Sequence, residues 1–203
     1  MPPSAFPLRT LRDQIADQLR NEILAHQHAP DAPLREHDLA KRFGTSRGPV
    51  RDVLLQLTQE GALVYRPNAG VRIGTPPDAE TRKLLMRLRK EIELAAVKRL
   101  IEGFQPDDEP QLRETLDRLR RACRSGDMPG IVGSDMDLHR HIVRRGAAPE
   151  IEQVWQSIAV RILMAYSRLS DFSDIHAEHV RIVEAICARD VKASRAALES
   201  NLI

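Results

Sequence analysis

Apolar residues recur every three or four positions at the start of the chain, the spacing at which side chains share one face of an α-helix. The first such stripe predicts a helix over 8–25. A loop with two prolines follows over 28–34, and a short helix over 35–44 comes next. Gly44 is expected to end that helix, because glycine readily adopts the left-handed conformation that closes one.

A third helix and a pair of strands are expected to complete this region. Ser46 is a favourable N-cap, apolar residues continue at helical spacing behind it, and Gly61 ends the helix. The segment 62–73 is typical of two short strands around an Asn/Gly turn. The proline-containing stretch 75–81 is typical of a linker. The pattern therefore predicts a small helical domain with a two-stranded wing.

The remaining residues are predicted to be helical throughout. Loops rich in Gly, Pro, Ser and Asp separate about six segments, which are 78–102, 108–124, 128–145, 149–169, 173–188 and 190–203. The predicted fold class is therefore mainly α. We expect a winged helix-turn-helix domain over 1–75, a linker over 76–82 and an all-α bundle of six helices over 83–203.

The composition is typical of a globular protein, with 42% apolar and 30% charged residues in a chain of 203. The longest fully apolar run covers only 162–166, which is too short to span a membrane. The first residues also lack the apolar core of a signal peptide. Cys123 and Cys187 are widely separated and form no CxxC motif. We therefore expect reduced thiols in a cytoplasmic protein.

The excess of positive charge is confined to the predicted winged domain. Residues 1–76 contain ten Lys and Arg against eight Asp and Glu, whereas residues 77–203 contain 21 of each. This distribution favours an anionic partner for the first third of the chain.

Two arginines stand where a helix-turn-helix reads DNA. Arg47 and Arg51 lie one turn apart at the start of the third helix, opposite its apolar stripe. A recognition helix contacts base edges with its first turns, and arginine forms two hydrogen bonds with guanine. Gly48 lets backbone approach a phosphate closely. Flanking phosphates are expected to be neutralised by Lys41, Arg42 and Arg72. An ordinary helical hairpin with solvated arginines is the alternative that the pattern leaves open.

Several polar side chains of the helical region lie on the apolar stripes of its helices. Asp135 and His139 are four residues apart and point the same way, so they form a workable two-ligand arm for a metal. His179 lies on a second apolar stripe and Asn201 on a third. A buried Asp–His hydrogen bond without a metal is the more common explanation of the same spacing.

Arg89 also lies on an apolar stripe, and a buried guanidinium needs an anionic partner. That partner is either Glu93, one turn further along the helix, or the carboxylate of a ligand. Arg161, midway along the fourth helix of the bundle, is a second candidate for binding an acidic ligand. Trp155 is interpreted as core packing.

Residues 8–74 resemble the winged-helix domain of the GntR transcriptional regulators. The matching positions are Leu34, Glu36, Leu39, Ala40, Ser46, Arg47, Pro49, Val50, Arg51, Leu54, Glu60, Gly61, Pro67, Gly70 and Val71. The family often has basic residues where this chain has His37 and Ala69. The resemblance implies a homodimer on a short palindrome of double-stranded operator DNA. The predicted DNA-binding residues are Glu36, His37, Arg47, Gly48, Arg51, Gly70 and Arg72.

Residues 82–203 resemble the FCD effector domain of the FadR-type GntR subfamily, through LRKEIELAAVKRL, DMDLH and EHVRIVEAICARD. Much of that subfamily holds a divalent metal with one Asp and three His. Asp135, His139 and His179 match three of these ligands, and Asn201 occupies the position of the fourth. The resemblance implies a divalent metal, with zinc or nickel favoured. An amide oxygen is a harder donor than imidazole, which weakens the preference for these metals.

These features predict a DNA-binding transcriptional regulator, in our interpretation a repressor, whose operator affinity a small organic acid controls. The resemblance implies that this acid joins the metal and Arg89. The main alternative is a metal-free FadR-type regulator that binds an apolar acid or no ligand. A metal-dependent enzyme is disfavoured, because no motif for a general base or a nucleophile accompanies the metal-capable residues.

Overall fold

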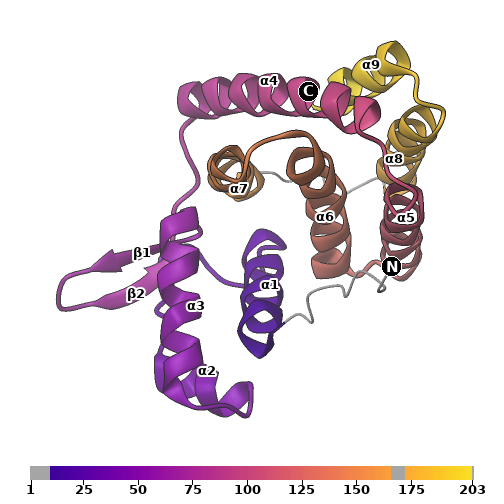
Figure 1. Ribbon diagram of the computed structural model, residues 1–203. Helices are drawn as coiled ribbons and strands as arrows, with labels where there is room; N and C mark the ends of the chain where they lie inside the picture. Colours follow the sequence, from indigo (N-terminus) through magenta and orange to yellow (C-terminus); the bar gives the residue numbers. More distant parts are fainter. Residues whose placement is uncertain (1–9, 166–171, 203) are drawn as a thin grey trace. The chain divides into compact units, whose positions relative to one another are not determined.

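The computed structural model describes residues 10–165 and 172–202 (Figure 1). It divides the chain into two compact units, Met1–Thr75 and Pro76–Ile203. In the described ranges the chain is mainly helical and has one pair of strands, which confirms the predicted fold class. No helix in these ranges is long and apolar enough to cross a membrane.

The first unit begins with a helix that its own sequence caps. The side chain of Thr10 accepts a hydrogen bond from the backbone N–H of Asp13, and the Asp13 carboxylate accepts one from the backbone N–H of Thr10. Apolar stripes then bring the helices together, with α1 packed on α3. The elements of the unit are α1 (Leu11–Leu24), α2 (Glu36–Arg42), α3 (Arg47–Glu60), β1 (Leu63–Arg66) and β2 (Gly70–Ile73).

Two ion pairs fix α1 against the helix-turn-helix that α2 and α3 form. Arg20 on α1 is almost fully buried, and its Nε lies 2.6 Å from Glu60 Oε2 at the end of α3. Glu22 on α1 accepts hydrogen bonds from both terminal nitrogens of Arg42 on α2. Arg42, which we predicted to contact a phosphate, therefore has an internal partner.

The two strands form an antiparallel wing in which Arg66 pairs with Gly70 at the turn. Gly70 has a φ of +73°, a conformation that glycine adopts at little cost and other residues rarely adopt. The loop before α2 lies along the wing, because the backbone N–H of Leu34 donates to the carbonyl oxygen of Val71 at 2.9 Å.

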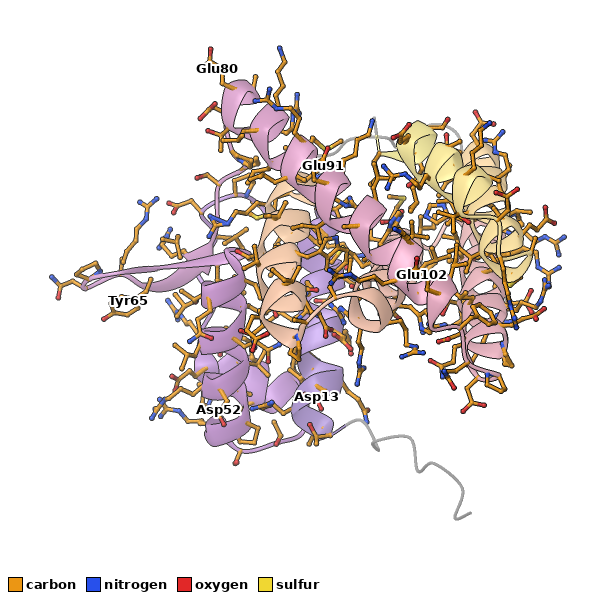
Figure 2. All side chains as sticks on the ribbon, turned by 45° about the horizontal axis from the view of Figure 1, so that its top comes forward. Asp13, Asp52, Tyr65, Glu80, Glu91 and Glu102 are labelled. Atoms are coloured by element: carbon orange, nitrogen blue, oxygen red, sulfur yellow. The ribbon has the colours of Figure 1, made fainter. Side chains whose placement is uncertain are left out.

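The second unit is a helical bundle. Its elements are α4 (Ala79–Glu102), α5 (Asp108–Ser125), α6 (Met128–Gly146), α7 (Pro149–Leu163), α8 (Phe172–Cys187) and α9 (Val191–Asn201). Helix α4 packs against α6, α7 and α9, and α5 packs against α6 and α8 (Figure 1). Glu80, Glu91 and Glu102 mark the exposed side of α4 (Figure 2). The opposite side of α4 carries its buried residues, including Arg89 and Glu93.

Helices α4 and α6 approach each other closely at Gly146. A Cβ atom at this position would lie 1.9 Å from the carbonyl oxygen of Ala96 on α4. On another side of α4, Arg195 of α9 donates from Nη1 to the carbonyl oxygen of Leu94 at 3.0 Å. Contacts from both α6 and α9 therefore hold the middle of α4 in place.

Most predicted helices occur within a few residues of their expected bounds. Helix α4 begins inside the stretch 76–82 that we predicted as a linker, because Asp78 caps it by accepting from the backbone N–H of Thr81 at 2.9 Å. The predicted helix 149–169 ends earlier, at Leu163, and residues 166–169 lie outside the described ranges. Cys123 and Cys187 are free thiols and are half-buried.

The contact at Gly146 predicts a sensitive position. We expect Gly146→Ala to lower the free energy of unfolding by about 1–3 kcal/mol, because the added methyl group forces α4 and α6 apart. Arg144→Ala on the exposed side of the same helix is the control and should have little effect. Thermal and urea unfolding followed by circular dichroism would test this. Equal stability of the two variants would show that the helices separate without cost.

Candidate functional site

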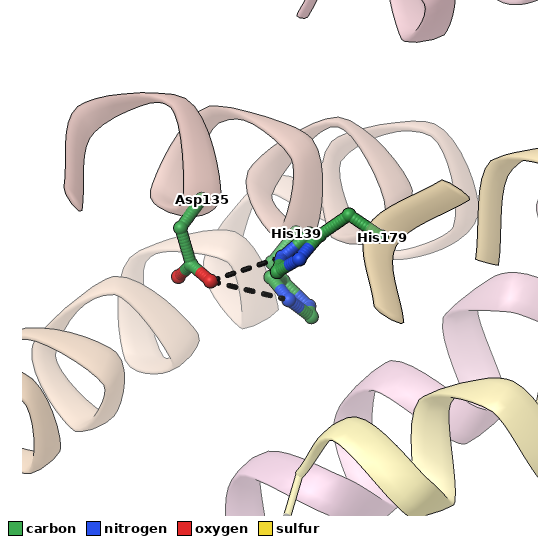
Figure 3. A group of neighbouring side chains, drawn as sticks. All are labelled: Asp135, His139 and His179. Atoms are coloured by element: carbon green, nitrogen blue, oxygen red, sulfur yellow. Dashed lines mark ion pairs between the residues drawn. The ribbon is translucent and has the colours of Figure 1, made fainter. Parts of the chain in front are cut away.

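Three side chains that can bind a metal meet between α6 and α8 (Figure 3). Asp135 and His139 come from successive turns of α6, and the apolar stripe of α8 carries His179 inward. One potential ligand atom of each residue lies within 4.8 Å of the other two. Both histidines are buried and Asp135 is half-buried. The structure thus brings together three of the four metal ligands that we predicted.

Each histidine uses its Nδ1 atom for a partner behind this site. The carbonyl oxygen of Ile175 lies 2.7 Å from His179 Nδ1 and can only accept, so that nitrogen carries the proton. His139 Nδ1 lies 2.6 Å from Glu93 Oε2. Within the part of the chain that the structure describes, neither Nε2 atom has a hydrogen-bond partner. Both Nε2 atoms instead face Asp135.

The two Nε2 atoms converge on one oxygen of Asp135. Its Oδ1 lies 3.0 Å from His179 Nε2 and 4.0 Å from His139 Nε2, as the dashed lines in Figure 3 show. The shorter contact lacks the alignment of a hydrogen bond and is an ion pair. A carboxylate oxygen and two imidazole nitrogens that converge in this way are a donor set suited to a divalent transition metal.

Glu93 supports the site from α4. Its carboxylate is fully buried, and its Oε1 accepts hydrogen bonds from Arg89 Nε at 2.7 Å and from Trp155 Nε1 at 2.8 Å. Its Oε2 contacts His139. Of the two partners that we considered for Arg89, the structure provides Glu93. The contacts of Glu93 with His139 and Trp155 were not predicted, because neither residue is near Glu93 in the sequence.

Burial and charge act in opposite directions on these groups. Burial raises the pKa of Glu93, but the charges of His139 and Arg89 outweigh it and hold the pKa at about 2. Burial also opposes ionisation of Asp135, yet its contact with His179 keeps its pKa well below the usual range. For His179, burial lowers the pKa and the contact with Asp135 raises it above the usual value. Both carboxylates are therefore ionised at neutral pH and can attract a cation.

The other predicted ligand-binding residues have different surroundings. Asn201 is half-buried on α9, and its Nδ2 donates to Glu178 Oε2 at 3.0 Å. Glu178 precedes His179 on α8, so this hydrogen bond joins α8 and α9 beside the site. Arg161 is exposed on α7, whereas Arg89 is buried and reaches His139 through Glu93.

Five of the predicted DNA-binding residues lie at the start of α2 and α3, and the other two, Gly70 and Arg72, lie on β2. Arg47 and Arg51 are exposed, and each places a nitrogen 3.0 Å from the carboxylate of Glu36. The hydrogen bonds from Arg51 and then from Arg47 hold the pKa of Glu36 below its usual value. Gly48 has open space where a Cβ would be, so backbone can approach DNA there. His37 is exposed beside Asp38.

The wing contains a basic residue that sequence analysis missed. Asp31, in the loop before α2, lies 2.9 Å from Arg66 Nη2 and 3.1 Å from Arg72 Nε. Arg66 is exposed and stands opposite Gly70, the predicted DNA-contacting glycine. Tyr65 next to it is also exposed (Figure 2). Pairing the two strands around the turn in the sequence would have placed Arg66 beside Gly70.

A winged helix-turn-helix followed by a helical bundle is the architecture of a DNA-binding transcriptional regulator with a second, all-α domain. Residues 11–73 match the bacterial regulatory proteins of the gntR family, and residues 84–202 match the FCD domain. The chain belongs to the GntR family of transcriptional regulators and carries an FCD domain. Both resemblances noted in the sequence are thereby confirmed.

Individual relatives agree with this assignment. The chain is 32% identical over 148 residues to the HTH-type transcriptional regulator McbR of Escherichia coli (strain K12). The matched region covers 70% of this chain and 66% of McbR. The chain is 25% identical over 200 residues to the HTH-type transcriptional repressor RspR of the same strain, covering 97% of this chain and 87% of RspR. The solved structure of E. coli McbR/YncC matches with a TM-score of 0.76 at 24% identity, over 96% of this chain and 94% of that chain. That likeness shows a shared fold.

The contacts of Glu36 predict a change in DNA discrimination. We expect Glu36→Gln to raise affinity for random-sequence DNA up to about fivefold, because the Glu36 carboxylate no longer competes with phosphates for the two arginines. Asp38→Asn removes the same charge from α2 but touches neither arginine, so it should change the affinity less. Fluorescence anisotropy at fixed salt concentration measures both. An equal increase in both variants would mean that only net charge matters.

Proposed function

We propose that this chain is a homodimeric transcriptional repressor whose operator affinity a small organic acid controls, through binding in the FCD domain together with a divalent metal. The observation that carries the proposal is the cluster of Asp135, His139 and His179, in which two buried imidazole Nε2 atoms face one half-buried carboxylate without hydrogen bonds to described residues. A buried polar atom without a partner costs free energy, which a bound metal would recover.

The residues present suit zinc or nickel. Two imidazole nitrogens are favourable donors for both ions, and each ring is held from behind by an acceptor, Glu93 for His139 and the Ile175 carbonyl for His179. Such partners orient a ligating ring and raise its basicity. A bound divalent cation would supply positive charge for the carboxylate of an effector. Three protein ligands would leave coordination positions for that carboxylate.

Arg89 is the protein group best placed to bind the rest of an acidic effector. It is buried in the same helical unit and connected to His139 through Glu93. An incoming carboxylate would compete with Glu93 for the guanidinium, whose planar shape suits carboxylates. Arg161 is the second candidate, although its exposure gives it a weaker electrostatic effect than a buried arginine.

Recognition of operator DNA is assigned to the exposed arginines of the first unit. Arg47 and Arg51 would read bases in the major groove, with Glu36, His37 and Gly48 beside them. Gly70 and Arg72 of the wing would contact the DNA backbone. We assign the same role to Arg66, because it shares the partner Asp31 with Arg72. The repressor role follows that of RspR. A repressor of this kind would act in the cytoplasm, where the DNA is.

A homodimer is supported by apolar side chains that the unit leaves exposed. Helices α4 and α7 pack against each other, and each exposes two large apolar residues. These are Leu84 and Leu88 on α4, and Ile151 and Val154 on α7. A second copy of the chain would cover them and would place two helix-turn-helix units on a two-fold symmetric operator.

A metal-free regulator is the second candidate, and Asn201 favours it. The family usually has a fourth histidine where this chain has an amide that bonds to Glu178. In that case Asp135 and the two histidines would form a buried ion-pair cluster, and Arg89 with the apolar walls would bind an apolar acid or no ligand.

The DNA-binding assignment predicts a loss of specific affinity. Selection from a pool of random duplexes with the wild-type protein would first yield its operator sequence. We expect Arg47→Ala and Arg51→Ala each to weaken binding to that operator by about 1–3 kcal/mol, because each removes a bidentate base contact. Arg12→Ala, an exposed arginine on α1, is the control. Wild-type affinity in both recognition-helix variants would rule out the assignment.

The metal assignment predicts about one divalent ion per chain by elemental mass spectrometry after mild dialysis. We expect a chelator to lower the melting temperature of the wild type, since metal stabilises the state that binds it. His179→Ala should lose both the ion and the response to the chelator. His176→Ala, a half-buried histidine on the same helix, should keep both. If the wild type contains no metal and added zinc and nickel do not change its melting temperature, the metal assignment is wrong. The metal-free regulator then remains as the function.

A further inference from the structure

Glu93 is the most deeply buried acidic side chain among the described residues. It has no exposed surface, and donors from three helices surround it. Arg89 donates from within α4, Trp155 from α7, and His139 contacts it from α6. A carboxylate removed from water is tolerated only where such partners replace the water.

The two oxygens of Glu93 have different tasks. Arginine Nε–H and indole Nε1–H are obligatory donors, so Oε1, which faces both, must accept. Oε2 then faces His139 Nδ1 at 2.6 Å, and an ionised carboxylate there makes that nitrogen the donor. The proton of a neutral His139 is thus placed on Nδ1. The lone pair remains on Nε2, which faces Asp135.

We infer that Glu93 is a positioning residue that selects the Nδ1–H form of His139 and so makes its Nε2 atom a ligand. This inference rests on the metal-binding part of the proposed function. Glu93 then takes part in sensing by orienting a metal ligand. Arg89 takes part as well, because it forms an ion pair with Glu93 on α4. An acid that competed for Arg89 would act on the residue that orients His139.

Substitution by glutamine tests this inference because an amide cannot reproduce the three contacts. With its oxygen toward Arg89 and Trp155, Glu93→Gln turns its NH2 group to His139 Nδ1, which must then accept. The proton of His139 moves to Nε2 and blocks the ligand atom. With the opposite orientation, the NH2 group meets two obligatory donors. Either arrangement disturbs a contact that the carboxylate satisfies.

The first measurement is zinc affinity by competition with a chromogenic chelator, on the full-length chain. We expect Glu93→Gln to lose about 10–100-fold in affinity, the usual effect of removing a partner of a ligating histidine. Glu91→Gln, an exposed position two residues away on α4, should bind zinc like the wild type. Trp155→Phe removes one donor but keeps the carboxylate, and should stay within about threefold of the wild type. Circular dichroism checks that each variant is folded.

The second measurement detects the proton itself and needs no metal. Two-dimensional 15N spectra of the metal-free protein, at a pH about two units above the ordinary histidine pKa, distinguish Nδ1–H from Nε2–H rings. We expect Nδ1–H for His139 in the wild type and a change toward Nε2–H in Glu93→Gln. His139→Ala identifies the signal by its disappearance.

The outcomes separate this inference from the function on which it rests. Zinc binding by the wild type, its loss in His139→Ala and its full retention in Glu93→Gln would overturn the inference and leave the metal site standing. An Nε2–H ring at His139 in the wild type would also overturn it. A wild type that binds no zinc would remove the metal site, and the 15N spectra would then decide whether Glu93 sets the proton on His139. A loss in Trp155→Phe as large as in Glu93→Gln would assign the effect to general packing.

Discussion

The buried carboxylate of Glu93 is the constraint on which the interior of the helical unit depends. Moving a carboxylate out of water costs several kcal/mol unless hydrogen-bond donors replace the water. Those donors come from α4, α6 and α7, so the three helices must meet at the level of Glu93. The tight contact of Gly146 with α4 allows α6 to come this close. The orientation of His139, and with it the candidate metal site, follows from that arrangement.

Acidic residues hold arginines in the winged unit as well, but there they do so at the surface. Glu36 joins Arg47 to Arg51, and Asp31 joins Arg66 to Arg72. These pairs explain why residues 1–76 carry only a small excess of positive charge although they bind DNA in our proposal. Each acid orders two arginines and reduces their attraction for phosphates in general. Base contacts then have to displace or reorganise the pair, which favours specific sites over random DNA.

Periodicity and spacing predicted the elements and the three side chains that meet at the candidate site. The apolar stripes identified the helices, and the interval of four residues placed Asp135 and His139 on one face. Such patterns describe a single helix and do not tell which faces of two helices meet. These patterns therefore could not predict the pairing of Glu93 with His139, which are 46 residues apart. Trp155 was correctly expected to be buried, but its hydrogen bond to Glu93 depends on the packing of α7 against α4.

The position of Arg89 and Glu93 in the chain gives the proposed regulation a physical route. An effector can shift an equilibrium only by binding one state more tightly than the other, so it must contact a group that differs between the states. In our proposal the Arg89–Glu93 pair is such a group, since a ligand carboxylate would compete for one member while the other contacts His139. Both residues lie on α4, which is the first helix after the wing. Only 74–78 separate β2 from α4, and Pro76 and Pro77 restrict the backbone of that short connection.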